Sequence, residues 1–332
     1  MNFERSCSVN PAARVPILLD VSIRDGGYVI GHSWTVDEAV SIVRAVAAAG
    51  VPFVEVGYLR TATGNPASPA TRCEPDYLGA LAAEARHTRL VVMVRPGEVS
   101  PESIKGLARQ GVGMVRVLAA RLDVAKAAPY LAAARAEGLV TAVNLTHASR
   151  FGPAGLGRAV REAAEAGADI VYLADSNGSL YPEDVAARVS AAVSAAESTD
   201  GRPLIGFHPH DNLGLAFANT CAALDSGARA VDASIGGIGK GGGNLRLELI
   251  AAHLTVHTAA DFSVDPLLRD HSAHAAKSRM IADTSAGTVM AGLLDISLDQ
   301  SRRFQEAVDR HGYDALLRGG VDFRSPAVLD RA

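Results

Sequence analysis

Two histidines separated by one residue, His208 and His210, are the clearest sign of chemistry in this 332-residue sequence. His208 lies in a short apolar run, "PLIGFHP" (203–209), that has the composition of a β-strand, and His210 follows this run directly. Side chains two residues apart on a strand point to the same face, so both imidazoles can approach one ion. A carboxylate would complete a nitrogen and oxygen ligand set suited to Mn²⁺, Mg²⁺, Co²⁺, Fe²⁺ or Zn²⁺. Alternatively, the two histidines cap the following helix and bond loop carbonyls.

A carboxylate of this kind, Asp25, follows Arg24 in "DVSIRDGGYVIGH" (20–32). An apolar strand that ends on adjacent opposite charges can be a strand end followed by a turn. It can also supply one metal ligand, with a cation beside it for an anion bound near the metal. The second interpretation requires that this strand end lies close to His208 and His210.

The pattern of apolar residues predicts a fold that brings these residues together. Ala-rich stretches with helical spacing, such as 35–50, 122–138 and 182–197, alternate with β-branched runs. Continuous apolar strands are typical of a parallel sheet covered on both faces. Eight strand–helix units over about 240 residues predict a (β/α)₈ TIM barrel, an α/β fold. The eight expected strands are 17–23, 52–58, 89–95, 113–119, 140–146, 169–175, 203–209 and 230–236.

An open doubly wound sheet is the alternative fold, but it predicts fewer regular units and a G-x-G-x-x-G turn after the first strand. That turn is absent from the sequence. The strand–helix alternation stops after residue 258, and 297–312 has helical spacing. We therefore expect an N-terminal tail (1–16), a TIM-barrel catalytic domain (17–258) and a C-terminal helical extension (259–332).

Active groups of a barrel lie where the carboxyl ends of the strands meet at one rim. Strands 7 and 1 are two places apart in a closed barrel, so Asp25 can meet the two histidines there. Asn244 follows the glycine-rich loop 236–244, and it is either the N-cap of the next helix or a further ligand. This loop is not a Walker A motif, because Gly241 follows Lys240 where that motif needs Ser or Thr.

Composition excludes several classes of partner. The net charge is −4 and no basic block occurs, so neither nucleic acid nor an anionic membrane is expected as a partner. No apolar stretch approaches the roughly 20 residues of a membrane span. The first 16 residues lack the apolar core of a secretory signal, and three scattered cysteines suit a reducing compartment. We therefore expect a cytoplasmic protein.

Several motifs occur in the same order as in a known superfamily, which they resemble over residues 17 to 257. It is the metal-dependent pyruvate aldolase and synthase group called DRE-TIM metallolyases, which are HMG-CoA lyase-like. "HPHDNLGLAFAN" and "GIGKGGGN" are most similar to the 4-hydroxy-2-oxovalerate aldolase-like branch. The branch that uses a cysteine in the strand-8 loop is excluded, since 236–244 contains none. The motifs are Asp20-x-Ser22-x-Arg24-Asp25-Gly26, Glu55-x-Gly57, His208-x-His210-Asp211-Asn212 and Gly236 to Asn244.

The resemblance implies a class II aldolase that forms or cleaves a carbon–carbon bond between a pyruvate enolate and an aldehyde. It implies a divalent cation, with Mn²⁺ or Mg²⁺ first and Co²⁺ or Zn²⁺ as alternatives. Its ligands would be Asp25, His208 and His210, with Asn244 as a further ligand, while Arg24 would stabilise the enolate. The substrates would be a 2-oxo acid and an aldehyde. The extension would cover the barrel mouth and can engage an aldehyde dehydrogenase, and a homo-oligomer is expected.

Other residues at the rim are expected to orient Arg24 or to contact the substrate. Glu55 is expected to orient Arg24, and Ser176 and Lys240 are expected to contact substrate. Lys240 is also the candidate for a Schiff-base mechanism, although lysines of that kind usually stand on a strand.

The acid–base group is where the sequence departs from the well-studied aldolases. They carry a histidine four residues after the arginine, and this position is Tyr28 here, as in a branch with R-D-G-G-Y. We rank Tyr28 first as the base, then His147 and His32. These aldolases also use a C-terminal tyrosine, but the one tyrosine after residue 258, Tyr313, stands too far along the chain to be equated with it.

The sequence leaves three alternative functions open. The first is a Claisen-type synthase that condenses an acyl-CoA with a 2-oxo acid on the same metal. The second is an iron oxygenase with two histidines and one carboxylate, which is typical of a jelly roll. The third is a binding protein without catalysis.

Overall fold

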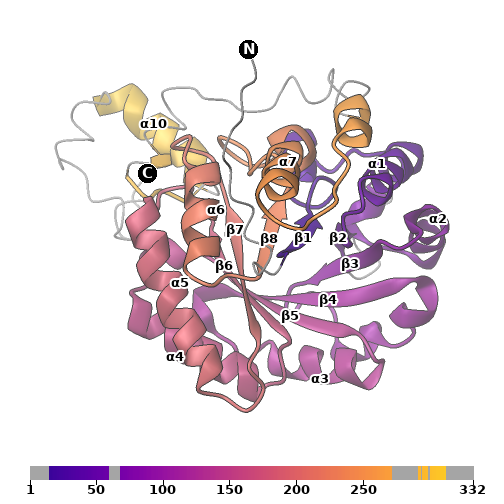
Figure 1. Cartoon of the computed structure of the whole chain (residues 1–332), viewed down its shortest axis with the longest axis horizontal. Coiled ribbons are helices and arrows are strands. Elements are labelled where there is room, and N and C mark those ends of the chain that lie inside the picture. The colour runs from indigo at the N-terminus through magenta and orange to yellow at the C-terminus, as the bar shows by residue number, and fades with distance from the viewer. Residues whose placement is uncertain (1–14, 60–67, 271–290, 293, 298–299, 312–332) are drawn as a thin grey trace.

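Eight parallel strands close into a barrel in the order β1 to β8, as shown by the computed structural model in Figure 1. The structure describes residues 15–59, 68–270, 291–292, 294–297 and 300–311, so Tyr313 lies outside the described residues. This confirms the predicted TIM barrel, and β7 lies two strands from β1 through β8. The strands are β1 (Ile17–Asp20), β2 (Phe53–Tyr58), β3 (Arg89–Val94), β4 (Val112–Ala119), β5 (Val140–Leu145), β6 (Ile170–Asp175), β7 (Leu204–Pro209) and β8 (Ala230–Ala233).

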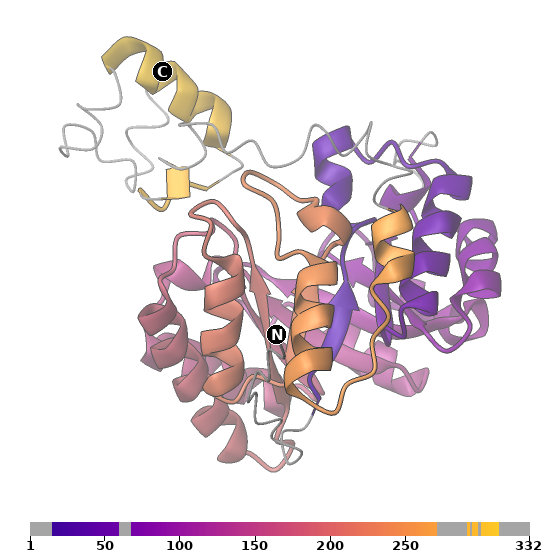
Figure 2. The same cartoon turned by 45° about the horizontal axis from the view of Figure 1, so that its top comes forward.

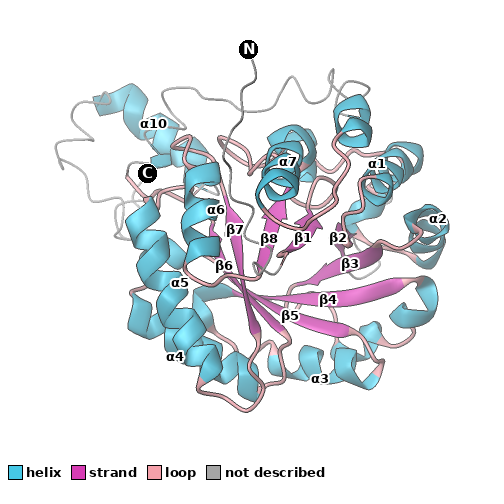
Figure 3. Ribbon diagram, in the orientation of Figure 1, coloured by secondary structure: helices cyan, strands magenta, loops and turns pink. Residues whose placement is uncertain are grey.

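Helices surround the barrel, and their apolar faces pack on the outside of the strands (Figure 3). Thr35 begins the first one with a capping box, in which its Oγ1 accepts a hydrogen bond from the Glu38 amide at 3.2 Å. The helices are α1 (Val36–Ala48), α2 (Pro75–Ala85), α3 (Ala128–Ala136), α4 (Pro153–Glu165), α5 (Pro182–Glu197), α6 (Ala216–Asp225), α7 (Leu247–His257) and α10 (Ser301–His311).

One connection departs from the expected strand–helix unit. Between β3 and β4, two 3₁₀ turns, Pro101–Ile104 and Leu107–Gln110, replace an α-helix. Gly106 separates the turns with φ 88°, and Gly111 ends the second with φ 87°. Left-handed glycines at this spacing stop a longer helix from forming.

Two strands are shorter than predicted, which changes where the charged pair lies. β1 ends at Asp20 and β8 at Ala233, three residues before the expected ends. The expectation that strand 1 itself ends in Arg24 and Asp25 was therefore wrong. The amides of Asp25 and Gly26 both donate to the Val21 carbonyl, at 2.8 and 3.2 Å, so the chain turns immediately after the strand. Arg24 and Asp25 lie in this turn, before a 3₁₀ helix at Gly26–Ile30.

The barrel interior changes from apolar to charged along the strands. At the amino end the inward side chains are apolar, and they include Leu19, Phe53, Met114 and Ala230. Because inward residues recur every second position, the next layer holds the residues two places further along three of these strands. That layer contains Glu55, Arg116 and Asp232, all of them buried. The apolar layer fills the amino end of the barrel, and the charged layer lies directly beneath the residues at the rim.

The chain after α7 first returns to the barrel. Leu267 is buried in the outer core, and Phe262 and Val264 pack against it. α10 lies beside the ring of helices, at the upper left in Figure 2. No helix among the described residues has the length and apolar character needed to cross a bilayer.

Candidate active site

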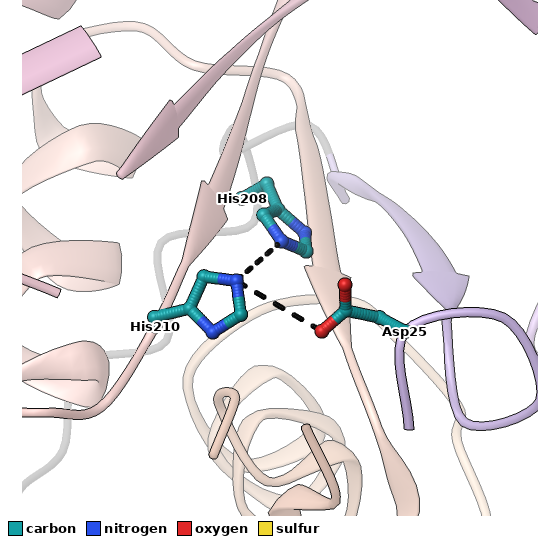
Figure 4. A group of neighbouring side chains, drawn as sticks. All are labelled: Asp25, His208 and His210. Carbon is teal, nitrogen blue, oxygen red and sulfur yellow. Dashed lines mark hydrogen bonds and ion pairs between the residues drawn. The ribbon is translucent and has the colours of Figure 1, made fainter. Parts of the chain in front are cut away.

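Asp25, His208 and His210 come together at the rim, each buried (Figure 4). Each offers one ligand atom, and these atoms lie within 4.8 Å of one another. The two Nε2 atoms are 3.3 Å apart, and Asp25 Oδ2 lies 3.8 Å from Nε2 of His210. β7 carries His208 and ends at Pro209, so His210 follows the strand directly. The structure thus brings together the three residues expected as metal ligands.

The other ring nitrogens show which face of each imidazole is available. Nδ1 of His208 lies 2.8 Å from Oδ2 of Asp232, and Nδ1 of His210 lies 3.2 Å from the Gly243 carbonyl oxygen. Both partners accept, so Nδ1 of each ring carries the hydrogen and Nε2 presents its lone pair. Burial lowers the pKa of His210 to about 4, which keeps this ring neutral near pH 7. Two ring nitrogens 3.3 Å apart can share a proton or a metal ion, and with the Asp25 carboxylate beside them these residues fit a divalent cation.

Asn244 lies beside the carboxylate and does not cap a helix. α7 begins at Leu247 with Arg246 as its N-cap. The Asn244 amide nitrogen donates to Asp25 Oδ2 and to the Ile238 carbonyl, each at 2.9 Å. Its buried Oδ1 has no hydrogen-bond partner within the part of the chain that the structure describes. This oxygen is therefore available to a cation, which is consistent with a fourth ligand.

The glycines of the strand-8 loop allow this placement. A Cβ on Gly239 would lie 2.4 Å from the Asn244 amide nitrogen. A Cβ on Gly242 would lie 2.6 Å from the Asp211 carbonyl oxygen. These glycines let the loop pack closely against its own asparagine and against the β7–α6 turn.

Arg24 is held by two carboxylates and retains one unused donor. Its Nε donates to Glu55 Oε2 at 2.6 Å and its Nη1 to Asp25 Oδ1 at 2.5 Å. Its buried Nη2 has no partner among the described residues. Burial opposes ionisation of Asp25, but Arg24 and then His210 outweigh it and hold the pKa of that carboxyl well below its usual range. Asp25 therefore remains a carboxylate, and Arg24 keeps a donor for an anion.

Two charged residues of this site, Arg116 and Asp232, were not predicted from the sequence. Arg116 is fully buried on β4, donates to Asp232 Oδ2 at 2.5 Å, and lies over the Tyr172 ring at 4.0 Å. Asp232 thus links Arg116 to His208. The signal was present as a charge within an otherwise apolar strand, because an unpaired charge there would be costly. Both residues lie within strands and not at the strand ends, where the active groups of a barrel are expected.

A cavity of about 450 Å³ opens above this site. Of the residues expected to act on substrate, Arg24, Tyr28, His147, Ser176 and Lys240 line it. Glu55 does not line the cavity, because it lies beneath Arg24. His32 also lies outside the lining and packs edge-on against Tyr28 with 4.6 Å between ring centroids.

Tyr28 belongs to a small hydrogen-bonded group with Tyr58 and Arg95. Its hydroxyl is 2.6 Å from that of Tyr58, and Arg95 Nη2 donates to both oxygens. Burial and then Tyr58 raise the pKa of Tyr28 well above its usual range. Tyr28 therefore keeps its proton near neutral pH, which suits a proton donor more than the base for which it was ranked first. Lys240 Nζ lies 4.0 Å from the centroid of the same ring.

Ser176 and His147 lie on neighbouring strand ends. The His147 amide donates to Ser176 Oγ at 3.0 Å, and His147 has φ 55°, in the left-handed region. A non-glycine residue in this conformation commonly marks a strained functional loop. Both residues thus face the cavity from the β5 and β6 side.

Family and sequence comparisons agree on one group of proteins. The HMGL-like family model matches residues 15–277. A 4-hydroxy-2-oxovalerate aldolase of Thermus thermophilus is 34% identical over 244 residues, which cover 73% of this chain and 69% of that protein. An oxaloacetate decarboxylase of Mycobacterium tuberculosis is 32% identical over 242 residues, which cover 73% and 70%.

Solved structures with lower identity share the fold. HMG-CoA lyase from Brucella melitensis aligns with a TM-score of 0.66 at 18% identity, covering 80% of this chain and 99% of that one. The carboxyl transferase domain of Rhizobium etli pyruvate carboxylase aligns with a TM-score of 0.71 at 18% identity, covering 93% and 56%.

Proposed function

This chain belongs to the HMGL-like family, and we propose that it is a divalent-metal-dependent aldolase acting on 4-hydroxy-2-oxo acids. It is a carbon–carbon lyase, as are its relatives named as aldolases. The proposed reaction cleaves the substrate into pyruvate and an aldehyde, or joins the two. Mn²⁺ or Mg²⁺ is the proposed cation, with Co²⁺ or Zn²⁺ as alternatives.

One observation carries this proposal. The Nε2 atoms of His208 and His210 lie 3.3 Å apart with their lone pairs exposed to each other, beside the ionised Asp25. A divalent cation held by Asp25, His208 and His210, with Asn244 as a further ligand, suits this set of nitrogen and oxygen atoms.

The residues around that cation suit the formation of an enolate. A divalent cation at this position would act as a Lewis acid on the 2-oxo group of the substrate. Arg24 can donate its unused Nη2 hydrogen to the oxygen on which negative charge develops. A fixed donor of this kind contributes about 3–4 kcal/mol to transition-state stabilisation. Glu55 and Asp25 hold the guanidinium in place, so Arg24 is oriented before substrate binds.

Proton transfer is assigned to the groups that line the cavity. Tyr28, with its raised pKa, holds the proton that the enolate carbon needs after the bond has broken. His147 faces the same cavity and is the candidate base for the substrate hydroxyl. Ser176 and Lys240 are proposed to contact the substrate, with Lys240 as a point charge for a carboxylate.

A panel of 4-hydroxy-2-oxo acids, incubated with the Mn²⁺-loaded protein, tests this function by release of pyruvate. Pyruvate release that stops on chelation supports the aldolase. Coenzyme A release from an acyl-CoA and a 2-oxo acid, without pyruvate formation, would instead establish the Claisen-type synthase. The closed TIM barrel argues against the iron oxygenase, which is typical of a jelly roll.

Two further assignments rest on the family resemblance. We propose that the protein is a homo-oligomer and that an aldehyde dehydrogenase consumes the aldehyde. Light scattering on the purified protein tests the first. Co-purification with a dehydrogenase from the same cells tests the second.

A further inference from the structure

The cavity above the proposed metal site is strongly cationic. Among its described lining residues the one carboxylate is Asp25, which is a proposed metal ligand. Five lining side chains carry a positive charge, and a simple 2-oxo acid has one carboxylate to match them. These five are Arg24, Arg95, Arg121, Arg150 and Lys240.

Two of the five cations have no role in the site already described. Arg24 bonds to Asp25 and Glu55, and Arg95 bonds to the two tyrosines. The exposed guanidiniums of Arg121 and Arg150 form no hydrogen bond or ion pair with any other residue that the structure describes. Guanidiniums that line a cavity and have no partner there are donors available to a bound anion.

Their position in the barrel separates them from the reacting end. Arg121 follows β4 and Arg150 follows β5, and these two strands are paired. In a ring of eight strands, β4 lies opposite β8 and β5 lies opposite β1. Arg24 and Asp25 follow β1, so the two arginines face the metal side from across the mouth.

The backbone at Arg121 indicates a loop held for function. Arg121 has φ 56° and Leu122 has φ 60°, two consecutive non-glycine residues in the left-handed region. Each such residue costs on the order of 1–3 kcal/mol, and strain of this kind persists mainly where it positions functional groups. Here it places Arg121 on the wall of the cavity.

We propose that Arg121 and Arg150 bind a second anionic group, a carboxylate or a phosphate, on the aldehyde part of the substrate. This inference rests on the proposed aldolase function, because it takes the 2-oxo acid end to lie at Asp25, His208 and His210. The substrate is then a 4-hydroxy-2-oxo acid with at least two negative charges. Its aldehyde fragment is an anionic aldehyde.

Matched pairs of aldehydes test the proposal in the addition direction, with pyruvate and the Mn²⁺-loaded protein. One pair is 4-oxobutanoate and pentanal, and the other is glyceraldehyde 3-phosphate and glyceraldehyde. We expect kcat/KM to be at least tenfold higher for the anionic member of one pair, and that pair identifies the group as carboxylate or phosphate. The preference should shrink in 0.5 M salt, which screens charge at an exposed site.

Variants then assign the preference to residues. In Arg121→Gln/Arg150→Gln the ratio of kcat/KM for the anionic aldehyde to kcat/KM for the neutral one should fall to about one. In Arg158→Gln, an exposed arginine on α4 outside the cavity, the ratio should stay as in the wild type. Calorimetric affinities of the four aldehydes for the same proteins give the comparison again without turnover.

Equal rates and equal affinities for both members of both pairs would overturn the second anion site. So would a preference that survives the double substitution. The proposed function is judged separately, by exchange of the pyruvate methyl protons with solvent in the absence of any aldehyde. Exchange of the pyruvate methyl protons, without a preference for anionic aldehydes, would support the aldolase function and rule out the second anion site.

Discussion

His208 and His210 direct their Nε2 atoms at each other across 3.3 Å, while Asp232 and the Gly243 carbonyl hold the opposite nitrogens. The arrangement fixes both tautomers before any ligand binds. It also leaves two lone pairs and the Asp25 carboxylate facing one point, which a divalent cation can occupy. The rim of the barrel is therefore organised for a metal by residues on β7, on β8 and in the turn after β1.

Asp232 acts on the proposed metal through His208. We expect Asp232→Asn to weaken Mn²⁺ binding by about 10–100-fold, the usual effect of removing an outer-shell carboxylate. Calorimetric titration of the metal-free protein measures this. Asp265→Asn, an exposed surface aspartate, is the control and should bind Mn²⁺ as the wild type does. Unchanged Mn²⁺ affinity in Asp232→Asn would show that this carboxylate only pairs with Arg116 inside the barrel and does not act on the metal.

Gly239 controls where Asn244 can lie. A methyl group at Gly239 would come within 2.4 Å of the Asn244 amide, so Gly239→Ala should move that side chain away from Asp25. We expect weaker Mn²⁺ binding, by about tenfold if Asn244 behaves as a supporting partner. Gly155→Ala on α4 meets no atom closer than 3.8 Å and serves as the control. Wild-type affinity in Gly239→Ala would remove Asn244 from the proposed ligand set.

Tyr28 is the proposed proton donor of the site. We expect Tyr28→Phe to lower kcat for pyruvate release by roughly 10²-fold or more, the usual contribution of a positioned proton donor. Mn²⁺ affinity should stay the same, since Tyr28 is not among the proposed ligands. Tyr58→Phe, which removes the neighbouring hydroxyl, is the comparison and should cost less. If Tyr28→Phe turns over at the wild-type rate, Tyr28 is not an acid–base group.

The sequence predicted the barrel because β-branched runs alternate regularly with Ala-rich stretches that have helical spacing. They also placed Asp25, His208 and His210 together, since β1 and β7 must share a rim. A charge within an apolar strand marks Arg116 and Asp232 in the sequence, but their contacts with each other and with His208 depend on which strands lie opposite one another inside the barrel. The turn at Val21, which ends β1 early, depends on hydrogen bonds that the apolar pattern does not encode.

Asp20 gives the stability of the protein a pH dependence. Burial raises its pKa to about 7, although Ser22 donates to the carboxylate. A pKa raised on folding means that the folded state holds the proton more tightly, so stability falls as pH rises from about 4 to about 7. The total loss is up to roughly 4 kcal/mol over that window.

Urea unfolding at pH 5 and pH 8 measures this effect. We expect Asp20→Asn to lose less stability between these two pH values than the wild type, because an amide does not titrate. Asp265→Asn should show the wild-type difference. Equal differences in all three proteins would contradict the raised pKa of Asp20.

We propose that Asp25, His208 and His210 would hold a divalent cation, which would supply the Lewis acid for loss of a methyl proton from pyruvate. Pyruvate in D₂O, with deuterium at C3 followed by mass spectrometry, tests this step without any aldehyde. We expect exchange with Mn²⁺, none after chelation, and none in His208→Ala/His210→Ala. Exchange that continues in the chelated protein, or in the double variant, would contradict it.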